Sequence, residues 1–595
     1  MQWKLGRCYL FGNDVPQNYT AAIKWFQKAA EQGHAAAQYD IGVCYRDSEG
    51  VPADIEEAAK WFQKAAEQGI AMAQCQLGLC YFHGEGFSQN HIEAVQWFRT
   101  AAKQGNDVAQ FLLGQCYRLG RGVFQSYVKA VKWYRRAAKQ GDFQSQCELG
   151  ACYYYGTGVP QDYAKAAKWF RKAAKRGYAV AQYNIGACYY LGVGVPLDYV
   201  KAIKWFRRAA KQDDTESQYT LGTCYYNNTG VSTDYIEAVK WFRKAAKKRY
   251  VLAQYMLGGC YLLGRGVPQD YVKAVKWYRK AVKQGYAVAQ YDLGVCYRDG
   301  EGVQPDTEKA VRLFRKAAKQ GDDKAQCALG QCYILGTGVS QDYVKGVNWI
   351  RKAAEQGHAI AQCDLGASYY YGNGVPQDYV EAVKWFFKAA EQNSVEAQHS
   401  LGVCYRDGEG VPQDRTEGVN WFRKAIEQGY VESQYALGEC YNKGFGVPVD
   451  DAEAVKWYRK AAEQGHANAQ NDLGVCYHNG EGVPQDIEEA VQWFRKAVEQ
   501  DCDMARCNLS ACYFHGVGVP VDKAEAMRLL CRATEQGLAI AQYNLGICYF
   551  QGEGVPMDKA EAEKWIHRAA EQEYKEAIDF LQSLAEGTLD TESGT

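Results

Sequence analysis

The stretch YYYGTGVPQDYAKAAKWFRKAA, residues 153–174, reads like a glycine-rich phosphate loop followed by a helix. Thirty-six residues later the chain repeats it with few changes as YYLGVGVPLDYVKAIKWFRRAA, residues 189–210. A P-loop needs Gly-Lys-Ser/Thr at the start of its helix, and a dinucleotide loop needs a preceding strand. Here Pro160 and Asp162 follow the glycines. The stretch therefore predicts a recurring structural unit and not a nucleotide site.

A Leu-Gly or Ile-Gly dipeptide marks this unit sixteen times at a spacing of 36, with Leu509-Ser510 as the one variant. A Tyr stands four residues after each leucine or isoleucine in every copy. A Trp stands twenty residues after it, except where Leu313 and Leu529 replace it. Sixteen copies without an insertion indicate a repeat array, in which each unit packs only on its neighbours.

Each unit has the apolar pattern of two helices. In AVAQYNIGACYYLG, residues 179–192, Ala181, Ile185 and Cys188 fall on one helical face, and DYAKAAKWFRKAAKRG, residues 162–177, has an alanine-rich face. The Gly inside the first helix costs about 1 kcal/mol relative to Ala, so we expect it to let the second helix approach closely. The Trp and Tyr side chains should fill the space between successive hairpins. The predicted fold is an array of antiparallel helical hairpins.

The residues between the helices fit the roles of helix ends. Asp162 is a predicted N-cap and Gly177 a predicted C-cap of the second helix. Gly156 and Gly158 are expected to adopt positive φ after the first helix ends. The loop therefore serves to reverse the chain.

This pattern resembles the Sel-one-like repeat family, a relative of the tetratricopeptide repeat, from Trp3 to about Ala570. The matching residues of one copy are Ala181, Ile185, Gly186, Tyr189, Gly192, Gly194, Val195, Asp198, Ala202, Trp205, Ala209 and Ala210. The resemblance implies an all-α fold, a right-handed α/α superhelical solenoid of about sixteen hairpins. It also implies a protein that serves as an adaptor in protein complexes, and it implies no single catalytic activity.

The ends of the chain depart from the repeat. Residues 1–570 are expected to form the solenoid, with a first repeat that enters in mid-helix and is a candidate for truncation. Residues 571–585 are expected to form a capping helix, in which Leu581 keeps the leucine position but Gln582 replaces Gly. Residues 586–595 are expected to be a disordered polar tail. No secretory signal is visible at the start, which favours the cytoplasm.

The cysteines and histidines do not form a recognisable reactive site. Fifteen of the 22 cysteines stand three residues after the recurrent leucine, with Ser368 as the one substitution. Neighbouring helices pack about 8–10 Å apart, which is too far for a disulfide between the recurrent cysteines of successive repeats. Secreted relatives in the resembled family pair cysteines within each repeat, and this chain lacks the second regular cysteine. We therefore expect buried thiols in a reducing compartment, no catalytic residues, no metal ligands and no cofactor.

Charge is unevenly distributed although the formal net charge is zero. Residues 101–290 sum to +20, the residues before them to −3 and those after them to −17. This basic arc favours an acidic partner. Head-to-tail association of a basic and an acidic arc is a further expectation. No apolar run is long enough to insert in a membrane.

The variable positions of the first helix are the candidates for partner binding. They stand one residue before the recurrent leucine, two after it and five after it, and they share one face, which we call the first-helix strip. In related helical solenoids the first helices line the concave surface, and three tyrosines would form an aromatic row there, within the basic arc. The predicted binding residues are Glu148, Tyr154, Asn184, Tyr190, Thr220, Tyr226 and Met256.

These observations predict a non-catalytic scaffold that binds a protein or peptide along the concave face. A secreted cysteine-rich relative with enzyme-like or cell-wall-ligand binding activity is the alternative. Anion or nucleic-acid binding through residues 101–290 is a further alternative, less favoured than a protein partner, and it would weaken steeply with salt.

Overall fold

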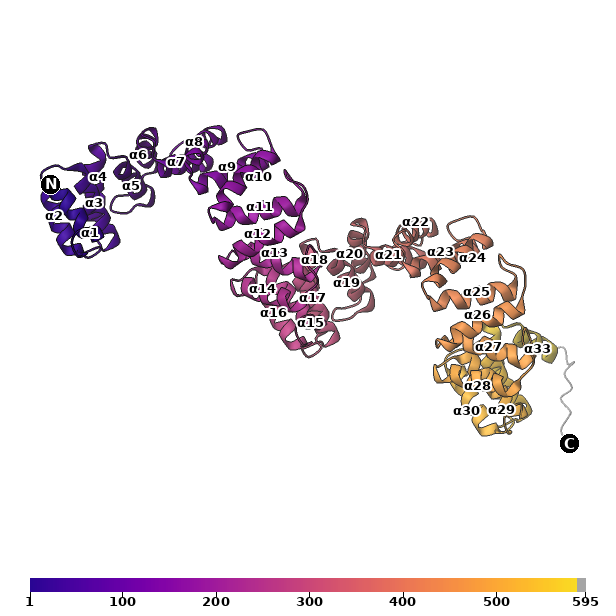
Figure 1. Cartoon of the computed structure of the whole chain (residues 1–595). Coiled ribbons are helices and arrows are strands. Elements are labelled where there is room, and N and C mark those ends of the chain that lie inside the picture. Colours follow the sequence, from indigo (N-terminus) through magenta and orange to yellow (C-terminus); the bar gives the residue numbers. More distant parts are fainter. Residues whose placement is uncertain (586–595) are drawn as a thin grey trace. The chain divides into compact units, whose positions relative to one another are not determined.

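The structure, a computed structural model, describes residues 1–585 as helices joined by short turns (Figure 1). Each 36-residue repeat forms one hairpin, with a first helix that begins the repeat and a second helix that ends it. The thirty-three helices of residues 1–585 are almost all 12 to 14 residues long, as the regular spacing of the sequence requires. The predicted all-α array of helical hairpins is confirmed.

The bounds of the helices follow the repeat from one end of the array to the other. The first helices are α1 (Gln2–Phe11), α3 (Ala35–Asp47), α5 (Ala71–His83), α7 (Asp107–Leu119), α9 (Phe143–Tyr155), α11 (Ala179–Leu191), α13 (Thr215–Tyr226), α15 (Val251–Leu263), α17 (Ala287–Asp299), α19 (Asp323–Leu335), α21 (Ala359–Tyr371), α23 (Val395–Asp407), α25 (Val431–Lys443), α27 (Ala467–Asn479), α29 (Asp503–His515) and α31 (Ala539–Gln551). The second helices are α2 (Tyr19–Glu31), α4 (Ile55–Glu67), α6 (His91–Lys103), α8 (Tyr127–Gln140), α10 (Tyr163–Lys175), α12 (Tyr199–Lys211), α14 (Tyr235–Lys247), α16 (Tyr271–Lys283), α18 (Thr307–Lys319), α20 (Tyr343–Glu355), α22 (Tyr379–Ala390), α24 (Arg415–Glu427), α26 (Asp451–Glu463), α28 (Ile487–Glu499), α30 (Lys523–Glu535) and α32 (Lys559–Glu571).

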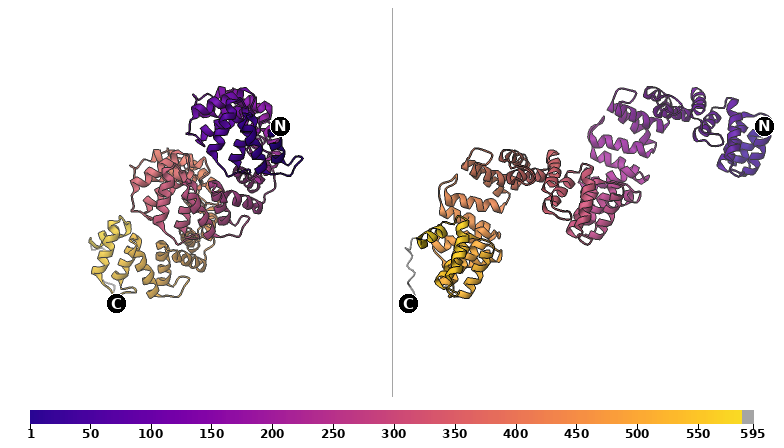
Figure 2. Two further views of the ribbon diagram at one scale, coloured as in Figure 1. Left: turned by 90° about the vertical axis from the view of Figure 1, so that its left-hand side faces the viewer. Right: turned by 180° about the vertical axis from the view of Figure 1, so that it is seen from behind.

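The chain divides into two compact units. The first comprises Met1–Ala289 with Gly300–Gln304, and the second Gln290–Asp299 with Pro305–Thr595. Within each unit a helix packs on the helix before it and the helix after it in the sequence, as the views in Figure 2 show from two further sides. Each unit is therefore built from contacts between neighbouring repeats.

The glycine after the recurrent leucine lies where the two helices of a hairpin touch. A Cβ atom added at Gly186 on α11 would lie 2.7 Å from the ring of Phe206 and 3.3 Å from the carbonyl oxygen of Ala202, both on α12. The ring of Phe206 and the side chain of Ala202 are fully buried. The expectation that this glycine admits the second helix is confirmed, and the aromatic ring that it admits is now identified.

The recurrent Trp packs between hairpins. Trp205 on α12 lies against a core cluster formed by Ala166, Phe170 and Ala173 of α10 together with Ile185 of α11. Its own hairpin thus contacts the preceding one through a large half-buried ring, as the sequence predicts. Burying an aromatic side chain removes on the order of 150–250 Å² from water, so this contact is a main contribution to the cohesion of neighbouring repeats.

The turns follow the capping pattern read from the sequence, with one small difference. Asp162 accepts a hydrogen bond from the Lys165 backbone N–H at 2.8 Å and caps α10. Gly156 and Gly158 adopt φ of 71° and 73°. The C-cap of α10 is Arg176, and Gly177, at φ 94°, is the residue after it. The left-handed conformation still falls on the glycine, because it avoids the Cβ clash.

The last described helix is α33 (Lys575–Ala585), which packs on α32. Ala577 is fully buried against Ile566 and Ala569, and Phe580 and Leu581 lie against the same cluster. The tail predicted to be disordered, residues 586–595, lies outside the described residues.

Candidate functional site

The structure places the seven predicted binding residues on four consecutive first helices of the first unit. Each is half-buried, so each keeps part of its surface available to a ligand. Their positions by helix are Glu148 and Tyr154 on α9, Asn184 and Tyr190 on α11, Thr220 and Tyr226 on α13, and Met256 on α15.

The three tyrosines of the strip pack on their own hairpins. The ring of Tyr154 meets that of Tyr163 edge to face, with centroids 5.2 Å apart. Tyr190 meets Tyr199 in the same way at 5.3 Å, and Tyr226 meets its counterpart on α14 at 5.2 Å. Within residues 1–585 no ring contact joins one strip tyrosine to another. The predicted row is therefore a series of separate, similarly oriented rings, and burial raises the pKa of both Tyr154 and Tyr190.

The remaining strip residues connect neighbouring repeats. The side-chain amide of Gln115 on α7 donates to Oε1 of Glu148 at 3.2 Å. Nδ2 of Asn184 donates to Sγ of Cys147 on the preceding first helix at 3.7 Å. Met256 packs on the core cluster formed by α14 and α15. These contacts orient the strip side chains before any partner binds.

The positive charge of residues 101–290 lies mainly on other helices than the tyrosines. The first helices α9, α11, α13 and α15 contain no Lys or Arg, whereas the second helices α8, α10, α12, α14 and α16 are rich in both. Lys168, Lys204 and Lys240 stand at equivalent exposed positions of α10, α12 and α14. The aromatic row thus falls within the basic arc of the sequence, but most residues that make the arc basic stand on the second helices, and Arg118 on α7 is the one cation of residues 101–290 at a strip position.

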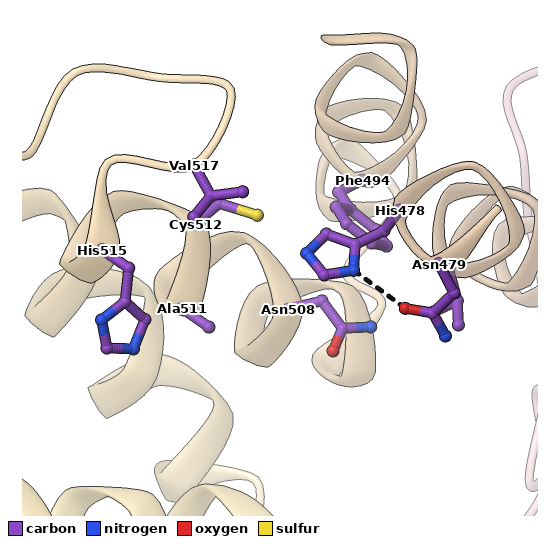
Figure 3. Close-up of a pocket in the computed structure, with 9 residues that line it drawn as sticks. His478, Asn479, Phe494, Asn508, Ala511, Cys512, His515 and Val517 are labelled. Carbon is purple, nitrogen blue, oxygen red and sulfur yellow. Dashed lines mark hydrogen bonds between the residues drawn. The ribbon is translucent and has the colours of Figure 1, made fainter. Parts of the chain in front are cut away.

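Hollows open along the strip between consecutive first helices of the second unit. One hollow of about 530 Å³ lies between α27 and α29, and Figure 3 shows its lining. His478 and Asn508 stand at strip positions, and Nδ1 of His478 donates to Oδ1 of Asn479 at 2.9 Å. His515 lies on the far side of the same hollow. Imidazole and amide groups over an apolar floor can hydrogen-bond a peptide.

A second hollow of about 280 Å³ lies between α19 and α21. It is lined by Gln331, Ile334, Asp364 and Ala367 of the strip, together with neighbouring residues. Neither hollow was predicted from the sequence, because the binding residues were predicted in the copies with tyrosines. The same three positions, applied to residues 328–371 and 472–515, would have found both.

A recurrent glutamine, three residues before the leucine, was also missed and proves to be structural. Gln38 is buried, and its amide donates to the carbonyl oxygen of Ala30 in the preceding repeat at 3.2 Å. The amide of Gln68, at the end of the same hairpin, donates to Oε1 of Gln38 at 2.6 Å. Equivalent pairs recur through both units, for example Gln284 with Gln254. Its recurrence every 36 residues was the signal available in the sequence.

The recurrent Tyr likewise has a polar partner in the preceding repeat. Arg171 on α10 donates to the hydroxyl of Tyr189 on α11 at 2.8 Å, and Arg207 donates to Tyr225 at 2.6 Å. Part of the positive charge on the second helices is therefore used within the array. Lysines of the second helices also pair locally, as Lys240 does with Glu237 at 3.0 Å, whereas Lys168 and Lys204 are exposed to solvent.

The described residues contain no cluster of three or more His, Cys, Asp and Glu side chains able to hold a metal ion. No helix of residues 1–585 has the length and apolar character needed to cross a bilayer. All 22 cysteines are free thiols, and most are buried. Burial raises the pKa of Cys188 to about 11, which keeps this thiol protonated and unreactive near neutral pH.

A stack of helical hairpins, with variable residues gathered on one face of the first helices, defines a helical-repeat solenoid protein. The chain belongs to the Sel1 repeat family: sixteen Sel1 repeats match it, from residues 1–34 through 539–574, and only residue 143 is skipped between them. The predicted family membership is confirmed.

One solved structure of a similar protein shares this architecture, and a second resembles the chain in sequence. The chain is 30% identical to c5321, a protective antigen present in uropathogenic Escherichia coli strains that displays an SLR fold; the match covers 90% of this chain and 98% of that one with a TM-score of 0.64. It is 34% identical to a Sel1 repeat protein from Oxalobacter formigenes over 51% of this chain and 88% of that one, with a TM-score of 0.40. No curated protein matches the chain.

Proposed function

We propose that the chain is a non-catalytic scaffold that binds protein or peptide segments along the first-helix strip. The observation that carries this proposal is that the hollows between α19 and α21 and between α27 and α29 are both lined by the variable strip positions. Curved helical arrays offer extended surfaces of this kind to extended ligands. Membership of a helical-repeat family whose members are generally protein-interaction scaffolds supports the same function.

The strip of the first unit favours an uncharged segment of the partner. Between α9 and α15 it presents Tyr154, Tyr190 and Tyr226 with small neighbours such as Ala187 and Thr223. Two charged groups there are already hydrogen-bonded within the array: Glu148 accepts from Gln115, and Arg265 donates to the hydroxyl of Tyr226 at 2.7 Å. Tyr supplies a large apolar face and a hydroxyl group at low cost in side-chain entropy. An acidic segment, if it binds, would be attracted by the second helices instead.

The experiment that tests this proposal is capture of partners from the native cell by the full chain, with and without the strip tyrosines. The test variant changes Tyr154, Tyr190 and Tyr226 together to Ser. The matched control changes three exposed apolar residues of second helices, Val200, Ile236 and Val272, to Ser. We expect the same partner to be recovered by the control and lost by the tyrosine variant. Undiminished recovery by the tyrosine variant would refute the strip assignment.

The exposed lysines of the second helices favour a second candidate, binding of an anionic partner such as an acidic protein or a nucleic acid. Lys168, Lys204 and Lys240 repeat at 36-residue intervals on exposed positions. Binding through them would release counterions and weaken steeply with salt. An affinity that is flat between low and high salt would exclude this candidate.

A further inference from the structure

The hollow between α19 and α21 contains a carboxylate without a cationic partner. Oδ2 of Asp364 accepts hydrogen bonds from Nε2 of Gln331 at 2.8 Å and from Sγ of Cys327 at 3.8 Å. Among residues 1–585 no side chain hydrogen-bonds its other oxygen, Oδ1, and no Lys or Arg forms an ion pair with it. The charged groups that act on Asp364 are His358, which caps α21, and Glu396 on α23.

The same arrangement occurs once more in the chain, 216 residues earlier, and there it contains a cation. Gln115 occupies the position of Gln331 and donates to Oε1 of Glu148, which occupies the position of Asp364. Nε of Arg118 donates to Oε1 of Gln115 at 2.8 Å. In that repeat the strip thus holds a guanidinium, an amide and a carboxylate in one connected series.

The second arrangement has the amide and a carboxylate but no guanidinium. Ile334 stands where Arg118 stands in the first, because both lie five residues after the recurrent leucine. As a result Oε1 of Gln331 accepts no hydrogen bond from any described side chain. Two acceptors, Gln331 Oε1 and Asp364 Oδ1, are therefore left without donors beside a hollow of about 280 Å³.

We propose that this hollow is a subsite for an arginine side chain of the bound peptide. The inference rests on the proposed function and adds the class of residue that the strip selects at one point. The planar guanidinium would take the place that Arg118 fills in the other copy and donate to Gln331 and Asp364. Its aliphatic stem would lie on Ile334, Leu335 and Tyr371, which line the hollow.

The charge of the surrounding chain favours the same ligand. Residues 291–595 carry a net charge of −17. Asp292 and Asp472 occupy the same strip position as Asp364 in other repeats of the second unit. A field of this sign attracts cationic segments and raises their local concentration.

The test compares arginine with citrulline, which has nearly the same shape but no charge. The probes are two immobilised libraries of nine-residue peptides with a fixed central residue, Arg or citrulline, and random neutral flanking residues. The full chain is compared with Asp364→Asn and with Ile334→Arg, which rebuilds the Arg118 arrangement. Glu355→Gln is the control, because it removes an exposed carboxylate at the end of α20, outside the strip.

We expect the unaltered chain and Glu355→Gln to retain the arginine library about tenfold more strongly than the citrulline library, the effect of one charge-assisted hydrogen-bonded contact. Asp364→Asn and Ile334→Arg should remove that preference. If the chain captures both libraries equally, or if the preference survives in Asp364→Asn, the arginine subsite is refuted while peptide binding stands.

A measurement independent of peptide capture separates the two proposals. When the protein is labelled at its isoleucine methyl groups, N-acetylargininamide should shift the NMR signal of Ile334, and the citrulline analogue should not. The shift should disappear in Asp364→Asn. Capture of neither library would refute the proposed peptide binding, and an unshifted Ile334 signal with N-acetylargininamide would refute the subsite.

Discussion

Arg176 stands thirty residues after Gln146, where most other repeats have a glutamine, and Oε1 of Gln146 is buried without a hydrogen-bond partner. In the regular repeats a glutamine amide fills this place, as Gln212 does for Gln182 at 2.8 Å. Arg176 instead donates to the backbone carbonyl of Gly141. Lys248 likewise stands thirty residues after Gln218 in place of a glutamine, and Oε1 of Gln218 is also buried without a hydrogen-bond partner.

Arg176→Gln should therefore stabilise the chain. A buried acceptor without a donor costs about 1–3 kcal/mol, and the exposed bond from Arg176 contributes less, so we expect a gain of up to about 1 kcal/mol. The reverse change, Gln212→Arg, should destabilise the chain by a similar amount. The midpoint of urea unfolding, followed by circular dichroism, measures both. Equal midpoints for the two variants would contradict the role given to the glutamine pairs.

Gly186→Ala should destabilise the hairpin although alanine favours helices. The new methyl group would lie 2.7 Å from the ring of Phe206, and overpacking of this kind costs about 1–3 kcal/mol. Gly259→Ala is the matched control, since a Cβ there has only the Tyr278 hydroxyl within 4 Å, at 3.8 Å. That variant should gain up to about 1 kcal/mol from helix propensity. Thermal unfolding of the two variants should shift in opposite directions.

Alkaline pH should weaken the fold through its buried thiols. Burial raises the pKa of Cys188 and of Cys224 from 9.0 to about 11. A thiol whose pKa is raised on folding stabilises the folded state below pH 9, and this contribution is lost as pH rises through about 11. We expect the unfolding midpoint to fall across that window and an aromatic disulfide reagent at pH 8 to react first with Cys8 and Cys531. The third half-buried thiol, Cys363, should react later, because burial raises its pKa to about 12. All 22 thiols should react in denaturant without reductant; fewer would point to disulfides and to an oxidising compartment.

The strip and the second-helix lysines should act separately on binding. Changing Lys168, Lys204 and Lys240 to Glu should abolish salt-sensitive binding of an acidic partner, because it reverses charge on one exposed face. The triple change of strip tyrosines to Ser should leave that binding intact and weaken capture of neutral segments. Affinity measured at low and high salt for each variant distinguishes the two surfaces. Loss of both activities in both variants would show that they form one site.

The predicted head-to-tail association has its own test. If the basic residues 101–290 of one copy meet the acidic residues after 291 of another, the apparent mass should exceed the 66.7 kDa of the chain at low salt and return to it at high salt. Light scattering measures this directly. A mass that does not change with salt would rule out association of this kind.

The fold could be predicted from the sequence because its determinants recur. Gly186, Tyr189 and Trp205 have equivalents in nearly every copy, so their common period reveals the hairpin without knowledge of any contact. The partner of each residue could not be derived in this way. That Gly186 faces Phe206, and that Tyr189 accepts a bond from Arg171, depends on how the two helices rotate against each other.

The candidate site was predicted only in part, since a binding surface depends on what does not recur. The strip positions were identified, but the tyrosines suggested a basic aromatic surface, and the structure puts the lysines on the second helices. The hollow beside Asp364 is lined by Ile334, which stands where Arg118 stands in the other copy. A difference of that kind has meaning only once the two neighbouring helices are known to face each other.

The bonds between repeats join residues at fixed separations, such as 18 residues for Arg171 and Tyr189 and 8 for Gln38 and Ala30. Removing or duplicating any 36-residue segment, wherever it is cut, would leave most donors opposite acceptors of the same type. The array can therefore gain or lose repeats, during evolution or by design, without needing a new kind of contact between repeats. Arg176 and Lys248 are the exceptions, because removing or duplicating a segment that contains either of them would change the hydrogen bonding of the buried glutamines.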